Sequence, residues 1–165
     1  SLKRTSLERL PEKKMSKKFY TTQAWFAAIG LTFLVSLCLG NAYAEKKPLA
    51  PDSITGTVKV DAEKVIELAQ HTPNLTIIDA RIRMDRLQGY IEGSRSLPDV
   101  ETDCHSLAKL APAKNSPLLF YCNGVKCGRS VKSSKIAVKC GYSNIYWFRG
   151  GFEEWQQKGL PFVKE

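Results

Sequence analysis

The sequence predicts an α/β fold in which a parallel β-sheet is covered by helices on both faces. Three apolar runs, at residues 75–79, 117–121 and 144–148, are typical of strands that are buried on both sides. Segments with helical character separate these runs, and the connections are too long for hairpins, so the strands are expected to be parallel. In such sheets reactive groups gather where strands end and helices begin. Cys122, which directly follows the second run, lies at such a point.

Shorter patterns predict the remaining elements. Residues 57–60 indicate a short strand, and Asp61 offers an N-cap for a helix that ends before a turn at Asn74. Gly141 is well placed to end a later helix. The other expected elements are a loop with a helical turn at 81–88, an extended piece at 96–98, and helices at 103–110, 129–139 and 152–158.

The first 44 residues are expected to direct export. Met15 opens a segment in which Lys17 and Lys18 precede an apolar stretch from about residue 24 to residue 39, and Ala42-Tyr43-Ala44 supplies small residues for cleavage. These are the three parts of a secretory signal peptide. A retained membrane anchor is the alternative, because the stretch is only slightly shorter than the about 17–25 residues that can span a bilayer.

The chain is therefore expected to have four parts. These are upstream or cloning-derived residues 1–14, a signal peptide at 15–44, a charged and proline-bearing linker at 45–55, and one domain at 56–165. Cleavage would leave no stable membrane association. The expected location is outside the cytoplasm, and periplasmic if the source is a Gram-negative bacterium.

The positive charge of the chain does not indicate a nucleic-acid partner. The formal net charge is +9, but the first 44 residues hold seven Lys or Arg against two acidic residues, which is more than half of the excess. No basic stretch in the remainder is interleaved with aromatic residues, as a nucleic-acid interface would require. We therefore expect no nucleic acid among the partners.

Four cysteines remain after the expected cleavage, namely Cys104, Cys122, Cys127 and Cys140. An even number in an exported domain ordinarily indicates structural disulfides. A domain of this size can, however, form a sufficient core without them. Three pairings are possible, and the sequence does not choose among them. Cys104 and Cys140 are expected to pack or to form a structural bridge.

The loop after Cys122 favours a reactive thiolate, which is the nucleophilic form of cysteine. The helix expected to begin near Arg129 presents unpaired N–H groups and the positive end of its dipole. Gly124 and Gly128 allow the backbone to curl so that successive N–H groups face one point. Lys126 and Arg129 add full positive charges. Each of these features would also favour an anionic substrate.

Short motifs occur in a fixed order over about residues 56–163. They are IDAR at 78–81, GYIEGS at 89–94, FYC at 120–122, GYSNIY at 141–146, RGGFEEW at 149–155 and GLP at 159–161. This ordered set resembles the rhodanese (sulfurtransferase) family. The resemblance implies a rhodanese-like α/β fold with a five-stranded parallel sheet, helices on both faces, and neither a cofactor nor a metal.

Sulfur transfer is the activity that the resemblance implies. The Cys122 thiolate would attack the outer sulfur of a small anionic donor such as thiosulfate, expel sulfite and hold a persulfide. Cyanide or a thiol, including a protein thiol, would then take the sulfur. Asp79 and Arg81 are expected to form an ion pair that braces the loop. The expected loop residues that bind the donor are Asn123, Gly124, Val125, Lys126, Cys127, Gly128 and Arg129.

Two departures from the family pattern stand out. Tyr90 occupies a position where many single-domain members carry a histidine with a mainly structural role. The loop is also longer than the usual Cys-x-x-Gly-x-Arg-Ser form, because Arg129 arrives two positions late and Cys127 lies in between. A longer loop would admit a bulkier donor or acceptor, or position a second thiol. For Cys127, the roles of resolving thiol, disulfide partner and spectator all remain open.

Other chemistries are less well supported by the sequence. A phosphatase of related fold uses Cys-x5-Arg, whereas the spacing from Cys122 to Arg129 is Cys-x6-Arg. A zinc site needs four well-spaced ligands, and neither His71 nor His105 is obviously near the loop cysteines. The main alternative to a sulfurtransferase is a non-enzymatic sulfur carrier or thiol redox relay that uses Cys122 and Cys127.

Overall fold

The computed structural model describes residues 48–164, which contain one five-stranded parallel sheet. The strand order is β1-β5-β4-β2-β3, and every neighbouring pair is parallel. This confirms the predicted fold class. The strands are β1 (Val58–Val60), β2 (Thr76–Asp79), β3 (Arg95–Ser96), β4 (Leu118–Tyr121) and β5 (Ile145–Phe148). The expected signal peptide and the first residues of the expected linker lie outside the described residues.

Five helices connect or follow these strands in the described part of the chain, each within a residue or two of its predicted position. They are α1 (Ala62–His71), α2 (Arg83–Arg86), α3 (Cys104–Leu110), α4 (Arg129–Lys139) and α5 (Gly151–Gln157). Within residues 48–164, none of the helices has both the length and the apolar character needed to cross a membrane.

Side-chain caps fix where α1 and α3 begin. The Asp61 carboxylate accepts a hydrogen bond from the Lys64 N–H at 2.9 Å, as the sequence predicts. At α3, Asp103 accepts from the Ser106 N–H at 2.7 Å, while the Ser106 hydroxyl accepts from the Asp103 N–H at 2.9 Å. Each such cap contributes about 1 kcal/mol of helix stability. By contrast, α4 has no side-chain cap, and its first turn is reached through the loop that follows Cys122.

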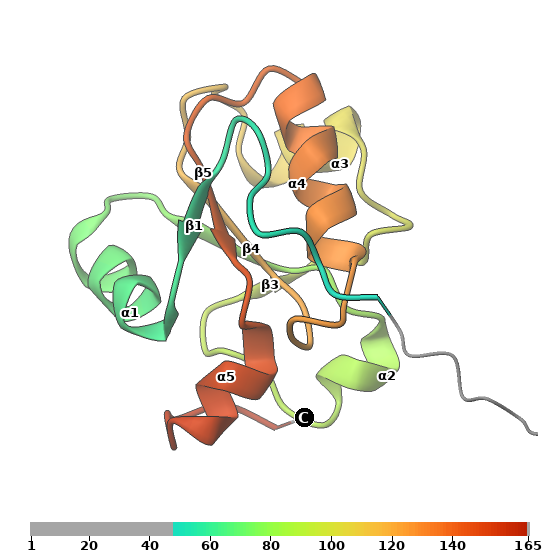
Figure 1. Ribbon diagram of the computed structural model, residues 1–165. Coiled ribbons are helices and arrows are strands. Elements are labelled where there is room, and N and C mark those ends of the chain that lie inside the picture. Colours follow the sequence, from blue (N-terminus) through green and yellow to red (C-terminus); the bar gives the residue numbers. More distant parts are fainter. Residues whose placement is uncertain (1–47, 165) are drawn as a thin grey trace, which may run out of the picture. The chain divides into compact units, whose positions relative to one another are not determined.

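Helices cover the sheet on both faces, with α1 on one side and α3 and α4 on the other (Figure 1). Alternate residues of β4 enter opposite cores, because side chains of a strand alternate between its faces. Leu119 and Tyr121 pack in the core that α1 and α5 complete. Leu118 and Phe120 pack in the core that α3 and α4 complete. All four are fully buried, which explains the continuous apolar run.

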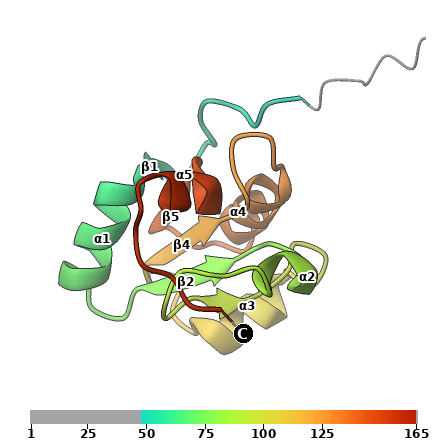
Figure 2. The same ribbon diagram turned by 90° about the horizontal axis from the view of Figure 1, so that it is seen from below.

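Residues 50–54, expected to be linker, instead pack on the domain. Ala50 and Ile54 are buried in a small apolar cluster with Val131 and Trp147. The Arg149 guanidinium donates hydrogen bonds of 2.8 Å to the carbonyl oxygens of Ala50 and Pro51. The polar and proline-bearing composition of residues 45–55 predicted a linker, but Ala50 and Ile54 within it are buried against the domain. We call residues 48–54 the N-terminal strap; it runs beside the loop that precedes α4 (Figure 2).

Cys104 and Cys140 form a disulfide with a Cα–Cα distance of 5.4 Å. It joins the first residue of α3 to the residue that ends α4. For this pair the sequence left open either simple packing or a structural bridge, and the structure shows the bridge.

Candidate active site

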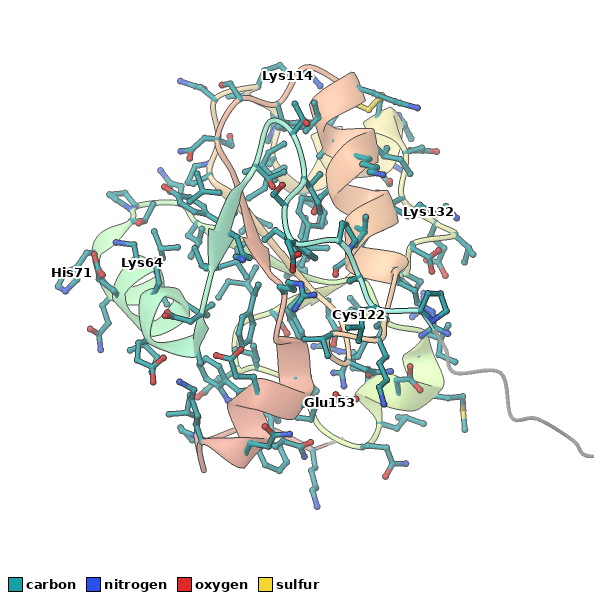
Figure 3. The ribbon with its side chains drawn as sticks, in the orientation of Figure 1. Lys64, His71, Lys114, Cys122, Lys132 and Glu153 are labelled. Carbon is teal, nitrogen blue, oxygen red and sulfur yellow. A yellow bond between two sulfur atoms is a disulfide. The ribbon has the colours of Figure 1, made fainter. Side chains whose placement is uncertain are left out.

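The candidate site is the loop of residues 122–128, which connects the end of β4 to the start of α4. Cys122 is its first residue and is only 1% exposed. Cys122 directly follows β4 and lies at the carboxyl edge of the sheet, as the sequence predicts. Figure 3 places Cys122 near the start of α4 and close to Glu153 of α5, while Lys114 lies at the opposite end of the domain.

Four consecutive carbonyl groups of this loop accept hydrogen bonds from backbone N–H groups. The oxygens of Cys122 and Asn123 accept from Phe152 and Glu153, at 2.8 and 2.6 Å. The oxygen of Gly124 accepts from the Cys127 N–H at 2.9 Å. The oxygen of Val125 accepts from the Ala50 N–H, in the N-terminal strap, at 2.7 Å. The orientation of each peptide plane in this half of the loop is therefore fixed.

Fixed carbonyls also fix the N–H groups, because the N–H of a trans peptide points away from the carbonyl of the same peptide. The N–H groups of residues 123–126 belong to those four peptides, and the described residues contain no cis peptide. None of the four donates a hydrogen bond within the described part of the chain. Four consecutive donors of the loop thus have a fixed orientation and no partner in the described residues, which is compatible with the anion-binding nest that the glycines predict.

The N-terminus of α5 holds the first part of the loop, which the sequence did not indicate. Gly151 begins α5 with φ of +60°, a conformation that favours glycine. A Cβ atom at this position would collide with the Cys122 carbonyl oxygen. Gly151 therefore allows the helix to approach close enough for the Phe152 and Glu153 N–H groups to bind the loop.

Cys122 and Cys127 form a disulfide in this structure, with a Cα–Cα distance of 6.2 Å. The two sulfur atoms can therefore meet despite the five-residue offset, the condition on which a direct role of Cys127 depends. Cys127 is 6% exposed and is held by the turn that its N–H makes with the Gly124 oxygen. Of the three roles left open for Cys127, the structure shows the disulfide partner, and a resolving role is compatible with the same contact.

Arg129 is placed differently from the expectation that it adds a full positive charge beside Cys122. Its Nη1 lies 3.3 Å from Asp85 Oδ2, and its Nε lies 3.7 Å from Asp99 Oδ1. The same Nη1 is 3.9 Å from the sulfur of Cys127. Two carboxylates thus share the charge, and the sulfur that the guanidinium contacts is Cys127. Lys126 is exposed and pairs with no acid in the described residues.

Asp79 and Arg81 form the predicted buried ion pair, with a distance of 2.6 Å between Nη2 and Oδ2. Arg81 is 1% exposed, and it also donates to the Gly89 oxygen at 2.7 Å. The Tyr121 hydroxyl donates to Asp79 Oδ2 at 2.8 Å. Burial raises the pKa of Tyr121, and the Asp79 charge raises it further, so the hydroxyl remains a donor. This network fixes the end of β4, one residue before Cys122.

Asp85 connects that network to the loop, and the sequence analysis missed it. Its carboxylate accepts from Asn123 Nδ2 at 2.8 Å and pairs with Arg129, so it binds both ends of the loop. Its backbone oxygen accepts from Arg81 Nη1 at 3.4 Å. Nothing in the polar run 81–88 distinguishes this carboxylate, because its partners lie 38 and 44 residues away.

Two pockets border the loop. One, of about 310 Å³, is lined by Val125 together with Arg149 and Glu154. The other, of about 160 Å³, is lined by Asn123 together with Arg81 and Phe152. Both are large enough for a small sulfur-bearing anion or a thiol side chain. Within residues 48–164, no three His, Cys, Asp or Glu side chains are grouped so that they could hold a metal ion.

Comparison with known proteins agrees with the fold. The family model described as Rhodanese-like domain matches residues 61–158. The rhodanese domain-containing protein CG4456 of Drosophila melanogaster is 32% identical over 108 residues, which cover 58% of this chain and 94% of that protein.

Two solved structures have the same fold. The thiosulfate sulfurtransferase of Pseudomonas aeruginosa is 24% identical with a TM-score of 0.56, over 66% of this chain and 20% of that chain. The 30 kDa polysulfide-sulfur transferase homodimer of Wolinella succinogenes is 23% identical with a TM-score of 0.54, over 67% of this chain and 80% of that chain. At this identity the likeness concerns the fold alone. On the match of the family model over most of the domain, the chain belongs to the rhodanese-like domain family.

Proposed function

We propose that this protein is a sulfurtransferase that moves a sulfane sulfur from a small anionic donor, through a persulfide on Cys122, to a thiol or cyanide acceptor. Membership of the rhodanese-like family supports a sulfur-transfer kind of function. Two proteins of the same fold are named for thiosulfate and for polysulfide. Both compounds are anions that carry sulfane sulfur, and thiosulfate is the donor that we propose to test.

The observation that carries the proposal is the set of four oriented N–H groups at residues 123–126. Their carbonyls are bound by other groups, and these donors have no protein partner in the described residues. They would stabilise the Cys122 thiolate before the reaction and the negative sulfur of the persulfide after it. Preorganised backbone donors of this kind cost no reorganisation when charge develops.

The first step transfers one sulfur to the enzyme. After reduction of the Cys122–Cys127 bond, the Cys122 thiolate attacks the outer sulfur of thiosulfate, the S–S bond of the donor breaks, and sulfite leaves with the electron pair. In the second step cyanide or a thiolate attacks the outer sulfur of the persulfide, and the Cys122 thiolate leaves. The backbone donors interact with the charged sulfur in both steps.

A phosphatase-like reaction is less compatible with the site. That chemistry would require Arg129 to bind the oxygens of a phosphate held by the loop. The guanidinium instead lies between Asp85 and Asp99 and contacts Cys127. The non-enzymatic alternative is a sulfur carrier or redox relay that uses the same two thiols, Cys122 and Cys127. A measurement of turnover distinguishes it from an enzyme.

We also propose that the protein acts after export, in the periplasm if the source is a Gram-negative bacterium. Lys17, Lys18 and the Ala42-Tyr43-Ala44 ending motivate this location. The two disulfides of the domain support an oxidising compartment. The proposed partners are the anionic donor and the acceptor, with no nucleic acid and no stable membrane association after cleavage.

The test is steady-state thiocyanate formation from thiosulfate and excess cyanide, measured on protein that has been reduced and then desalted. Wild type should turn over many times, whereas Cys122→Ser should lose all activity, since a serine hydroxyl is not ionised near neutrality and cannot hold sulfane sulfur. Retention of most activity in Cys122→Ser would exclude Cys122 as the nucleophile. Single-equivalent sulfur uptake without turnover would favour the carrier.

A further inference from the structure

The second loop cysteine has its own environment, distinct from that of Cys122. Cys122 lies beside the oriented N–H groups of residues 123–126. Cys127 lies beside a cation, with Arg129 Nη1 at 3.9 Å from its sulfur. Arg129 is in turn held by Asp85 and Asp99. Each thiol of the pair thus has a separate group that favours its thiolate, which a packing residue would not need.

The loop also holds the two sulfur atoms within bonding reach of each other. The Cα atoms of Cys122 and Cys127 are 6.2 Å apart, and both side chains are buried, at 1% and 6% exposure. The turn from the Cys127 N–H to the Gly124 oxygen lies between them. The N-terminal strap holds the same turn through the Val125 oxygen. A thiolate at Cys127 is therefore already placed against the sulfur of Cys122.

We propose that Cys127 is a second catalytic residue, which attacks the Cys122 persulfide, releases sulfide and leaves the Cys122–Cys127 disulfide for a dithiol reductant to reopen. The inference rests on the proposed persulfide at Cys122. It adds a product, sulfide, and a class of co-substrate, a dithiol, to the proposed transfer reaction.

The reaction balances in atoms and electrons. The Cys127 thiol gives its proton to the outer sulfur of the persulfide, and the resulting thiolate attacks the Sγ atom of Cys122. The bond from that Sγ to the outer sulfur breaks, and the outer sulfur leaves with the electron pair as HS⁻. The sulfane sulfur is reduced to sulfide, and the two loop thiols are oxidised to a disulfide. A dithiol then reduces this disulfide by exchange and is itself oxidised to a cyclic disulfide.

The two environments also give the exchange a direction. Cys127 is slightly more exposed than Cys122, at 6% against 1% of the residue surface, and we expect the incoming thiolate to attack its sulfur first. The leaving group is then the Cys122 thiolate, which the N–H groups of residues 123–126 stabilise, and a better-stabilised thiolate leaves faster. Each cycle therefore ends with Cys122 in the form that accepts the next sulfur.

The test is a single-turnover measurement of sulfide on protein that is reduced, desalted and mixed with one equivalent of thiosulfate without any acceptor. Wild type should release close to one equivalent of sulfide and lose its two loop thiols. Cys127→Ser should release none, keep the added sulfur on Cys122, and still form thiocyanate when cyanide is added. After this single turnover, treatment with a dithiol followed by desalting should restore the two loop thiols of wild type, which should then release sulfide from a second equivalent of thiosulfate.

Three outcomes would overturn the inference. The first is a wild type that holds a stable persulfide on Cys122 without releasing sulfide, the second is an added sulfur that peptide mapping finds on Cys127, and the third is equal sulfide release from both proteins. Failure of the proposed function is a different result, because neither protein would then gain sulfur or form thiocyanate. The release of sulfite from thiosulfate, measured in parallel, distinguishes failure of the inference, in which sulfite is released, from failure of the proposed function, in which it is not.

Arg129 provides a second readout with a matched control. Arg129→Gln should slow sulfide release by about tenfold, because the Cys127 thiolate loses the guanidinium beside its sulfur, with a smaller effect on thiocyanate formation. Lys132→Gln is the control, because Lys132 also pairs with Asp99, at 3.1 Å, but lies outside the loop. Equal slowing of sulfide and thiocyanate formation in Arg129→Gln would assign Arg129 to the loop as a whole and contradict its action through Cys127.

Discussion

The two disulfides lie at opposite ends of α4 and differ in what surrounds them. Cys104–Cys140 joins the beginning of α3 to the end of α4 and closes a 36-residue span. Cys122–Cys127 spans five residues inside the loop before α4 and lies among oriented N–H groups and a guanidinium. The same covalent bond thus occurs once in a structural setting and once in a reactive one, and its neighbours distinguish the two.

The two disulfides also differ in how much they are expected to contribute to the free energy of unfolding. In the chain-entropy model, closing the 36-residue span of Cys104–Cys140 stabilises the fold by about 4 kcal/mol, whereas the five-residue span of Cys122–Cys127 contributes about 2 kcal/mol. The loop is in addition held by backbone hydrogen bonds from α5 and from the N-terminal strap. We therefore expect the loop disulfide to open and close without unfolding, and the other to be needed for stability.

Reduction of the loop disulfide should have the largest effect on activity. Oxidised protein should form thiocyanate at less than about one hundredth of the rate of reduced protein, since the sulfur of Cys122 is not a nucleophile while it is bonded. The Cys104→Ser/Cys140→Ser double variant should show the same ratio. The measurement is thiocyanate formation before and after reduction and desalting. An activity that is the same before and after reduction would contradict the proposal that the loop disulfide, unlike Cys104–Cys140, controls activity.

Loss of the Cys104–Cys140 bond should have the largest effect on stability. The double variant Cys104→Ser/Cys140→Ser should lose about 4 kcal/mol in free energy of unfolding at most, as measured by chemical denaturation. Cys127→Ser, measured under the same conditions, should lose no more than about half of that. Equal losses, or a greater loss for Cys127→Ser, would mean that the loop bond is also structural.

Gly151→Ala tests how α5 holds the loop. The new Cβ would collide with the Cys122 carbonyl oxygen and would also be strained at a φ of +60°, so both stability and activity should fall. Gly159→Ala is the control, because Gly159 has a φ of +67° but no atom within 4 Å of the added Cβ. Backbone strain alone should cost on the order of 1–3 kcal/mol in both variants. Thiocyanate formation should fall more than about tenfold only in Gly151→Ala, and similar activities would contradict a positioning role of Gly151.

Arg149→Met should have the smallest effect. It removes the two hydrogen bonds that hold the N-terminal strap, whose Ala50 N–H binds the Val125 oxygen of the loop. At about 1 kcal/mol net for each hydrogen bond, the strap loses about 2 kcal/mol of binding to the domain. We expect about half of this loss to reach the loop, which lowers kcat/KM about threefold to tenfold. Asp52→Asn is the control, since Asp52 also pairs with Arg149 but is 95% exposed. Identical kinetics for Arg149→Met and Asp52→Asn would contradict the expectation that the N-terminal strap helps to hold the loop.

The fold could be predicted well because its determinants are local. Continuous apolar runs identify β2, β4 and β5, and Asp61 and Asp103 mark the starts of α1 and α3. The reactive position of Cys122 follows from the end of β4 and the start of α4, both of which are visible as patterns. The buried pair of Asp79 and Arg81 was also foreseen, since it lies within three residues of chain.

The groups that hold the loop could not be predicted, because they are distant in the sequence. Asp85 reaches Asn123 over 38 residues, and Arg149 reaches Ala50 over 99 residues. No local pattern marks either contact. The same distance explains why the ion pairs of Arg129 were not predicted, because its partners Asp85 and Asp99 belong to other segments.

The central claim, that the loop thiol Cys122 carries sulfur and the other cysteines do not, is tested most directly by locating one added sulfur. The protein should be the Cys127→Ser variant, reduced, desalted and treated with thiosulfate, so that the persulfide is not resolved. Intact mass should increase by one sulfur atom, peptide mapping should place it on Cys122, and cyanide should remove it. No added sulfur, or sulfur on Cys104 or Cys140 instead, would contradict the account.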